Sequence, residues 1–314
     1  MKIIRKFSLT ILVFSAFLLP NNVLAFDVVN LPDTLVKDDF IVSPAKTEIV
    51  MSPGDKIVKY ITILNRFGVD YNFSVTAEDF SPDKESGNPV LNGGVVLDRF
   101  FSLKNYIKPD ADSFFLRQGS RATVAITISV PKNAPPGGRY AAVLIGASPR
   151  QKTDSQTTII SRIGSLFLVR VNGVAEENGH LTNFIFKDGK FWISYRNDGN
   201  IHLNSYGVVE IEDDMGNLLE IVQIDPWTIL PGSTRSRALS LSGDIPNGKY
   251  TATIKLNRGY EDIIDIKEIA FRLGPILITD KIPEIKVDLS FEYYVIIIFI
   301  GVLILLGVRF IRKK

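Results

Sequence analysis

Residue types able to do chemistry are scarce in this sequence. It has no cysteine and only two histidines, His180 and His202, both beside predicted loops. Zinc sites need paired histidine, cysteine or carboxylate ligands, and no HExxH or similar spacing is present. The GxSxG turn of serine hydrolases and the phosphate-binding P-loop are also absent from the sequence. These observations predict a protein that is not an enzyme and that carries no cofactor and no metal.

An acidic cluster occurs where the sequence predicts a tight turn. Glu212, Asp213 and Asp214 are followed by Gly216 and Asn217. Calcium takes oxygen ligands from such clusters, but the EF-hand spacing is absent. A solvated turn is the simpler explanation, and calcium binding here stays an open alternative.

Trp192 is one candidate for a side chain that binds a partner. If its alternating neighbours Phe191, Ile193 and Tyr195 face the core, Trp192 faces outward. An exposed indole can stack on a sugar ring or anchor a protein interface. The alternative, which we favour, is that Trp192 packs on the other domain or under a loop.

The second candidate surface is a segment from Asp79 to Leu116 that has no counterpart in the second half of the chain. It carries two aromatic candidates for partner contacts, Phe100 and Tyr106. Binding residues often lie on loops held by a rigid scaffold. Residues 95–107 fit either a short helix or an irregular strand, and their periodicity does not decide between the two.

The net charge of +2 conceals a segregation of charges. Seven of the 36 basic residues lie in the first 25 and the last six positions, so 29 remain against 34 acidic residues. A mildly acidic middle argues against a nucleic-acid partner, which requires a basic face.

The most distinctive stretch runs from Arg117 to Ala147. Apolar residues alternate with polar ones from Ala122 to Val130, which predicts a half-buried strand. A turn rich in proline and glycine follows, and then a second apolar run from Tyr140 to Gly146. This pattern predicts a β-hairpin.

A shortened copy of the same pattern recurs from Pro231 to Leu256. In both copies Gly-Ser, a strand, proline, glycine and tyrosine follow in the same order. Short strands at about ten-residue spacing with turn residues between them are typical of β-sandwiches. We therefore predict an all-β fold of two tandem Ig-like β-sandwiches, residues 40–173 and 180–273, after a leader at 26–39 and before a stalk at 274–290.

The N-terminal 25 residues have the features of a secretion signal. Lys2, Arg5 and Lys6 precede an apolar run from Phe7 to Leu19, and cleavage is predicted between Ala25 and Phe26. An uncleaved anchor is the alternative.

Residues 291–311 are predicted to form one transmembrane helix, followed by a basic cytoplasmic tail at 312–314. The predicted anchor residues are two tyrosines at headgroup level and four basic residues at the cytoplasmic end: Tyr293, Tyr294, Arg309, Arg312, Lys313 and Lys314. The expected location is the plasma membrane, as a single-pass protein with its N-terminal ectodomain outside.

The first half resembles a known family through the segments VSPAKTEIVMSPGD, FFSLKNYI and SVPKNAPPGGRYAAVL. They are similar to the peptidoglycan-binding N-terminal domain of WxL-interacting proteins, which are bacterial surface proteins. The second half, with YRNDGNIHLNSYG and WTILPGSTR, looks more like an Ig-like module of other exported bacterial proteins. The resemblance implies peptidoglycan binding without assigning it to particular residues.

These observations lead to a functional prediction. We expect a non-catalytic cell-surface binding or scaffold protein whose ectodomain binds peptidoglycan or another surface protein. The alternative is a membrane-tethered assembly chaperone of the pilus-chaperone type, acting by strand donation.

Overall fold

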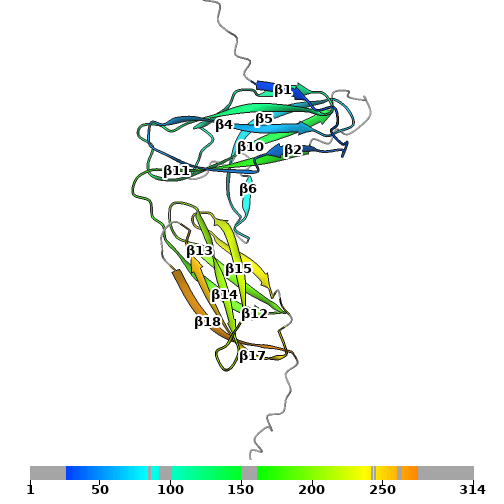
Figure 1. The fold of residues 1–314 in the computed structure, drawn as a ribbon. Coiled ribbons are helices and arrows are strands. Elements are labelled where there is room, and N and C mark those ends of the chain that lie inside the picture. Colours follow the sequence, from blue (N-terminus) through cyan, green and yellow to red (C-terminus); the bar gives the residue numbers. More distant parts are fainter. Residues whose placement is uncertain are drawn as a thin grey trace, which may run out of the picture. The chain divides into compact units, whose positions relative to one another are not determined.

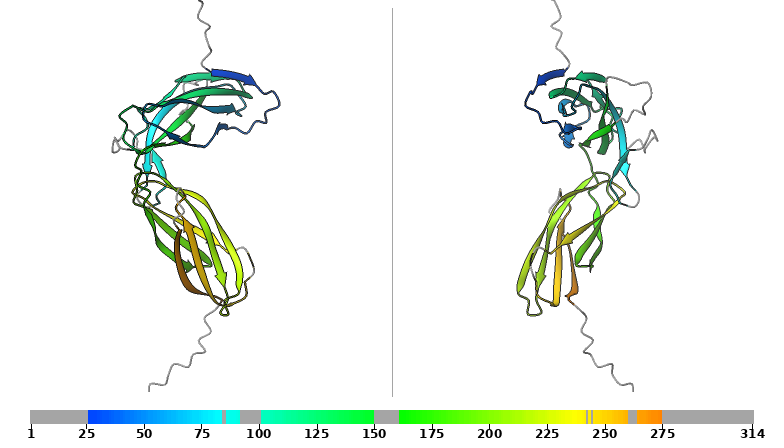
Figure 2. Two further views of the ribbon diagram at one scale, coloured as in Figure 1. Left: turned by 60° about the vertical axis from the view of Figure 1, so that its left-hand side comes forward. Right: turned by 90° about the vertical axis from the view of Figure 1, so that its right-hand side faces the viewer.

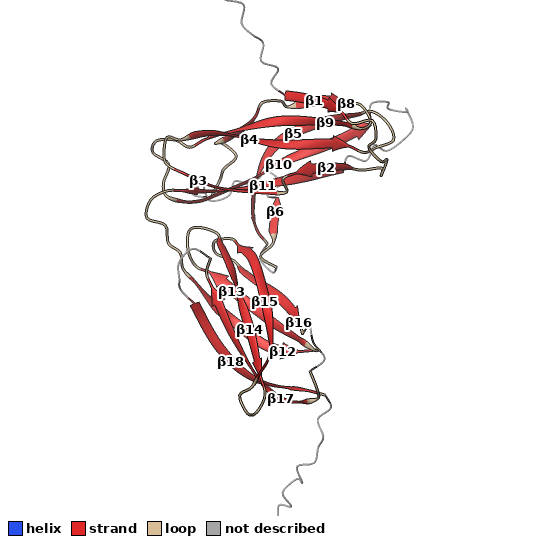
Figure 3. Ribbon diagram, in the orientation of Figure 1, coloured by secondary structure: helices blue, strands red, loops and turns tan. Residues whose placement is uncertain are grey.

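A computed structural model describes residues 26–83, 86–91, 101–149, 161–241, 243, 245–259 and 264–274. The described residues form strands, turns and loops and contain no helix, so the fold is all-β (Figure 3). The chain divides into two compact units, residues 1–272 and residues 273–314.

Both predicted membrane-related segments fall outside this description. Ala25, the residue before the predicted cleavage point, is not described, and neither are the predicted helix at 291–311 and its anchor residues. Within the described ranges, no helix has the length and apolar character needed to cross a membrane.

The first set of strands forms two sheets (Figure 1). One sheet has the order β1-β9-β4-β2, with β7 also paired to β9, and the other has the order β3-β11-β10-β5-β6, with β8 also paired to β5. The strands are β1 (Phe26–Asn30), β2 (Phe40–Ser43), β3 (Lys46–Met51), β4 (Lys56–Asn65), β5 (Tyr71–Pro82), β6 (Pro89–Leu91), β7 (Ile107–Pro109), β8 (Ser113–Leu116), β9 (Ser120–Ser129), β10 (Gly137–Pro149) and β11 (Ser161–Val171).

The core lies between these two sheets. Ile61 and Val124 from one sheet and Val143 and Phe167 from the other belong to the same buried apolar cluster. Strand β9 supplies Ala122, Val124, Ile126 and Ile128 to this cluster, which confirms the alternation seen in the sequence. The sheets therefore pack face to face.

The predicted hairpin from Arg117 to Ala147 is wrong. Its two strands, β9 and β10, lie in different sheets: β9 pairs with β1, β4 and β7, and β10 pairs with β5 and β11. The turn between them carries the chain from one sheet to the other. Strand β10 is buried along both faces, which explains why its sequence is apolar without alternation.

The predicted leader contains a strand. Strand β1 pairs antiparallel with β9, Phe26 opposite Val124 and Asn30 opposite Ser120. Its sequence, FDVVN, is too short for a periodicity that would distinguish it from a loop.

The second set of strands forms a three-stranded sheet, β12-β13-β16, and a four-stranded sheet, β15-β14-β17-β18. Figure 2 shows these strands from two further sides. They are β12 (Gly179–Lys187), β13 (Lys190–Asn197), β14 (Leu203–Glu212), β15 (Leu218–Ile229), β16 (Thr234–Ser240), β17 (Gly248–Asn257) and β18 (Ile264–Leu273).

Two hairpins predicted in this half are confirmed. Asp188 and Gly189 join β12 to β13, with φ of 53° and 73°. Both central residues of a type I′ turn need positive φ, so Asp-Gly suits this turn. A longer turn, residues 213–217, joins β14 to β15 in the second hairpin.

The internal repeat is visible at one buried asparagine in each half, Asn65 and Asn197. Each side-chain amide donates two hydrogen bonds to backbone carbonyls, and its oxygen accepts one from the backbone N–H two residues later. The partners are Val69, Leu116 and Phe67 for Asn65, and Ile201, Ile229 and Gly199 for Asn197. The same residue type thus closes the same turn in both halves.

Candidate functional site

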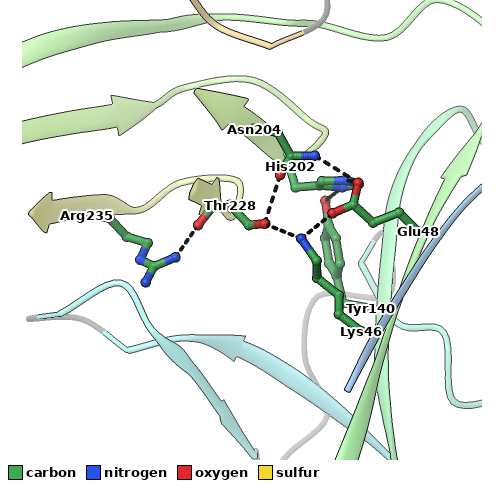
Figure 4. A network of polar contacts seen from close by, with 7 residues as sticks. All are labelled: Lys46, Glu48, Tyr140, His202, Asn204, Thr228 and Arg235. Carbon is green, nitrogen blue, oxygen red and sulfur yellow. Dashed lines mark hydrogen bonds and ion pairs between the residues drawn. The ribbon is translucent and has the colours of Figure 1, made fainter. Parts of the chain in front are cut away.

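A polar network joins β3 of the first set to strands β14 and β15 of the second (Figure 4). Lys46 Nζ donates to Thr228 Oγ1 at 3.0 Å and lies 2.5 Å from Glu48. Asn204 Nδ2 donates to Glu48 Oε2 at 2.8 Å, and Thr228 Oγ1 donates to Asn204 Oδ1 at 2.8 Å. We call these four residues, together with His202, the junction network.

His202 lies on the buried side of the junction network. Only 2% of the residue is exposed, and its Nε2 lies 3.8 Å from Glu48 Oε2. Its Nδ1 lies 3.4 Å from the hydroxyl of Tyr140, and the two rings meet edge to face. The nearby ring of His202, aided by Lys46 and opposed by burial, holds the pKa of Glu48 at about 2.

Apolar contacts lie beside the junction network. Leu230, which follows β15, belongs to a buried cluster with Phe80, Tyr140 and Leu168 on the outer face of the sheet that contains β10. Arg235 on β16 donates to the carbonyl of Thr228 at 2.5 Å and to Asn88 Oδ1 at 2.8 Å. These contacts are structural in character. Among the described residues no group of three potential metal ligands occurs.

A different feature, an open strand edge, lies at the start of β11. Strand β3 pairs in parallel with β11 only from Leu166 to Val171. Strand β10 covers the other edge of β11 from Val171 back to Ser161. Among the described residues, no strand pairs with the outer edge of residues 161–165, which we call the open edge of β11.

One hydrogen bond shows in which direction the backbone groups of the open edge point. The N–H of Leu166 donates outward to the carbonyl of Ala45, which precedes β3. Backbone groups of alternate residues in a strand point to the same edge. The N–H and C=O groups of Gly164 and Arg162 therefore also point outward, where a further strand would bind them. Ile163, on the core-facing side, is 36% exposed.

Trp192 faces outward, as the alternation predicts, with 40% of its surface exposed. It lies between Ile185 on β12 and Ala238 on β16, so the three residues form an exposed apolar row across the sheet. Its predicted role in binding a partner stays a prediction.

Of the two insertion candidates, the described one, Tyr106, lies in the first set of strands, whereas Trp192 lies on β13 of the second. Tyr106 is half-buried and packs against the first core, and Phe100 lies outside the described residues. Residues 101–106 form turns and an isolated bridge rather than a helix, and β7 begins at Ile107. Asp79 fixes this loop by accepting hydrogen bonds from Ser102, Leu103 and Lys104. Tyr106 is half-buried in this fixed loop, so it is a weaker binding candidate than an exposed side chain.

The acidic turn is organised by hydrogen bonds within the turn itself. Asp213 accepts from the side chain and the backbone N–H of Asn217 and from the N–H of Met215. These bonds lower the pKa of Asp213. Asp213 thus closes the hairpin between β14 and β15.

The sequence-based prediction missed the junction network and the open edge. In the sequence, Lys46 and Glu48 look like ordinary polar residues of a half-buried strand, and no residue near them indicates a distant partner. The repeat places Tyr140 where the second half has Tyr250, but this signal does not indicate His202, because Tyr250 bonds to Pro246 within its own half.

No family model matches the chain. No curated protein matches it at a significant level. The resemblance to WxL-interacting proteins is therefore neither supported nor opposed, and it stays a prediction.

Solved structures do match the chain. The class 5 fimbriae chaperone CfaA is 13% identical, over 76% of this chain and 100% of that chain, with a TM-score of 0.39. The complex of the chaperone CsuC with the tip subunit CsuE, from Acinetobacter baumannii, matches with 13% identity, coverages of 74% and 98%, and a TM-score of 0.36. The SafA pilin and SafB chaperone complex of Salmonella enterica matches with 12% identity, coverages of 78% and 100%, and a TM-score of 0.33.

These matches bear on one part of the sequence-based description. The matching structures just named are pilus chaperones or their complexes with pilus subunits, so they give no support to the description as a single-pass, peptidoglycan-binding adhesion protein. The prediction of a β-sandwich fold is consistent with them.

Proposed function

We propose that the protein is a non-catalytic binding protein that adds an extended segment of another exported protein to the open edge of β11. It would act as an assembly chaperone built from two tandem Ig-like β-sandwiches. The secretion signal predicted in the first 25 residues supports a place outside the cytoplasm.

The observation that carries this proposal is the orientation of Arg162 and Gly164. Their N–H and C=O groups point away from β10, along the line that β3 occupies further on. Unpaired backbone groups on a strand edge are a template for another strand, and strand addition is a common mode of peptide recognition. The neighbouring Ile163 offers apolar surface to alternate side chains of the added strand.

The experiment compares two substitutions at Arg162. Arg162→Pro removes the outward N–H and blocks close approach of a strand, whereas Arg162→Ala keeps the N–H and removes only the side chain. Arg162 is exposed, and its ion pair with half-buried Glu78 is long, at 3.6 Å, so neither change should unfold the protein.

The probe is a fluorescent peptide of alternating valine and threonine, with binding measured by anisotropy. We expect Arg162→Pro to weaken binding about tenfold, since it removes one or two backbone hydrogen bonds, and Arg162→Ala to leave binding unchanged. Hydrogen exchange of the Arg162 and Gly164 amides should slow when the peptide is bound. Equal affinity of both variants, or protection at another strand only, would overturn the proposal.

A further inference from the structure

Strand β18 forms the outer edge of the four-stranded sheet. It pairs with β17 on one side, and among the described residues no strand pairs with its other side. A ten-residue edge strand of this kind presents a row of backbone groups that can bind another strand.

The side chains of β18 alternate between the core and the solvent. Asp265 accepts a hydrogen bond from the hydroxyl of buried Tyr195, and Phe271 packs against Phe191, so these two residues face the core. The intervening positions face outward, and Ile264 and Ile266 are 53% and 65% exposed. Two large apolar residues on an unpaired edge strand indicate an interface.

The opposite edge of the same sheet is protected in ways that β18 is not. Strand β15 contains Pro226, and it is paired with β14 through two register irregularities. Two of its carbonyls, of Asp225 and Thr228, accept hydrogen bonds from Arg237 and Arg235. Proline, bulges and covered carbonyls prevent a further strand from pairing. The sequence of β18, IDIKEIAFRL, has no proline and no glycine.

We propose that β18 pairs antiparallel with β18 of a second copy of this chain, so that two four-stranded sheets become one continuous sheet. The proposal is independent of the strand addition at β11. It identifies β18 as an interaction surface whose partner is the protein itself.

The charges of β18 are compatible with a second copy of the strand as its partner. In an antiparallel pair centred on Ile266, this residue faces its own copy, and Asp265 faces Lys267 of the second copy on both sides of the centre. Registers centred on Lys267 or Glu268 place like charges directly opposite each other, which destabilises a strand pair. The register centred on Ile266 therefore brings opposite charges together on both sides of an apolar residue.

The absence of cysteine from the chain permits a direct test in the full chain. Ile266→Cys places two thiols opposite each other at the centre of the proposed pair, within the distance that a disulfide requires. The matched control is Ile221→Cys on β15, the other edge strand of the same sheet, where isoleucine is 45% exposed. We expect mild oxidation to convert the Ile266→Cys variant to a covalent dimer and to leave the Ile221→Cys variant monomeric.

Sedimentation without oxidation gives the second measurement. The unmodified chain should show a concentration-dependent dimer, Ile266→Lys should weaken it at least about tenfold, and Ile221→Lys should leave it unchanged. Circular dichroism checks that each variant is folded. A chain that stays monomeric at every concentration, or cross-linking that is faster for Lys267→Cys than for Ile266→Cys, would overturn the proposal.

Discussion

The hydroxyl of Tyr140 lies 3.4 Å from Nδ1 of His202, so a residue of β10 contacts the start of the second half of the chain. Tyr250, the equivalent residue in the repeat, donates instead to the carbonyl of Pro246 within its own half, at 2.6 Å. A tyrosine that bonds to the backbone a few residues upstream is a known feature of β-sandwiches. In the first half of the repeat, the equivalent tyrosine, Tyr140, therefore contacts the junction network instead.

The different partners of the two tyrosines predict different consequences of removing each hydroxyl. Tyr250→Phe removes a hydrogen bond to the backbone and should lower the free energy of unfolding by about 1 kcal/mol. Tyr140→Phe keeps the ring in its apolar cluster and should also cost about 1 kcal/mol, but it should additionally speed hydrogen exchange at Leu230 and Asn204. Urea denaturation and exchange on both variants provide the test. Faster exchange at these two residues in Tyr250→Phe as well would contradict it.

The two buried asparagines should be among the most sensitive polar positions. Asn65→Ala or Asn197→Ala leaves backbone groups without their partners in a buried turn, and each should lower the free energy of unfolding by about 3 kcal/mol. Asn172→Ala is the control, because its amide donates an exposed hydrogen bond to Ser52 and its loss should cost under about 0.5 kcal/mol. Urea denaturation measures all three. Equal losses at the buried and exposed positions would show that the turn bonds contribute little.

Features that depend on residues close together in the sequence were predicted correctly, and features that depend on distant residues were not. Alternation along β9 and the Asp188-Gly189 turn depend on neighbouring residues, and both were predicted correctly. The sheet to which β10 belongs depends on strands far away in the sequence. Its apolar residues face two different clusters, and a run without alternation does not reveal its partners.

The candidate sites show the same limit. The outward orientation of Trp192 follows from period two alone. By contrast, Glu48 and Asn204 are 156 residues apart, and nothing near either residue indicates the other. The open edge of β11 was invisible for a related reason, since it exists only because β3 stops pairing at Leu166.

At Gly207 the backbone of the paired strand lies so close that adding even one methyl group should destabilise the protein. A Cβ atom at Gly207 would lie 2.0 Å from the backbone oxygen of Lys255 on the paired strand β17. Gly207→Ala should therefore force β14 and β17 apart and lower the free energy of unfolding by about 2 kcal/mol. Gly68→Ala, where the nearest atom would be 3.5 Å away on the Val36 side chain, should have little effect. Similar melting temperatures for the two variants would refute the argument.

Glu48 should make the junction network sensitive to acid. Its pKa is about 2 in the folded protein, against an ordinary value of 4.5, first because of His202 and then because of Lys46. A carboxyl whose pKa is depressed by folding stabilises the folded state fully above its ordinary pKa. That stabilisation is lost as the pH falls from about 4.5 to about 2. Glu48→Gln lacks the titrating group, so its stability should depend less steeply on pH in this window.

The measurement is the urea midpoint at several pH values for the unmodified chain and for Glu48→Gln. The difference between the two should be largest near neutral pH and should shrink as the pH falls toward 2. Asp214→Asn, in the exposed turn between β14 and β15, controls for the loss of one negative charge elsewhere. If the unmodified chain and Glu48→Gln lost stability in parallel, the carboxylate of Glu48 would not be held by His202 and Lys46 in solution, and the contacts that Glu48 makes in Figure 4 would not contribute to stability.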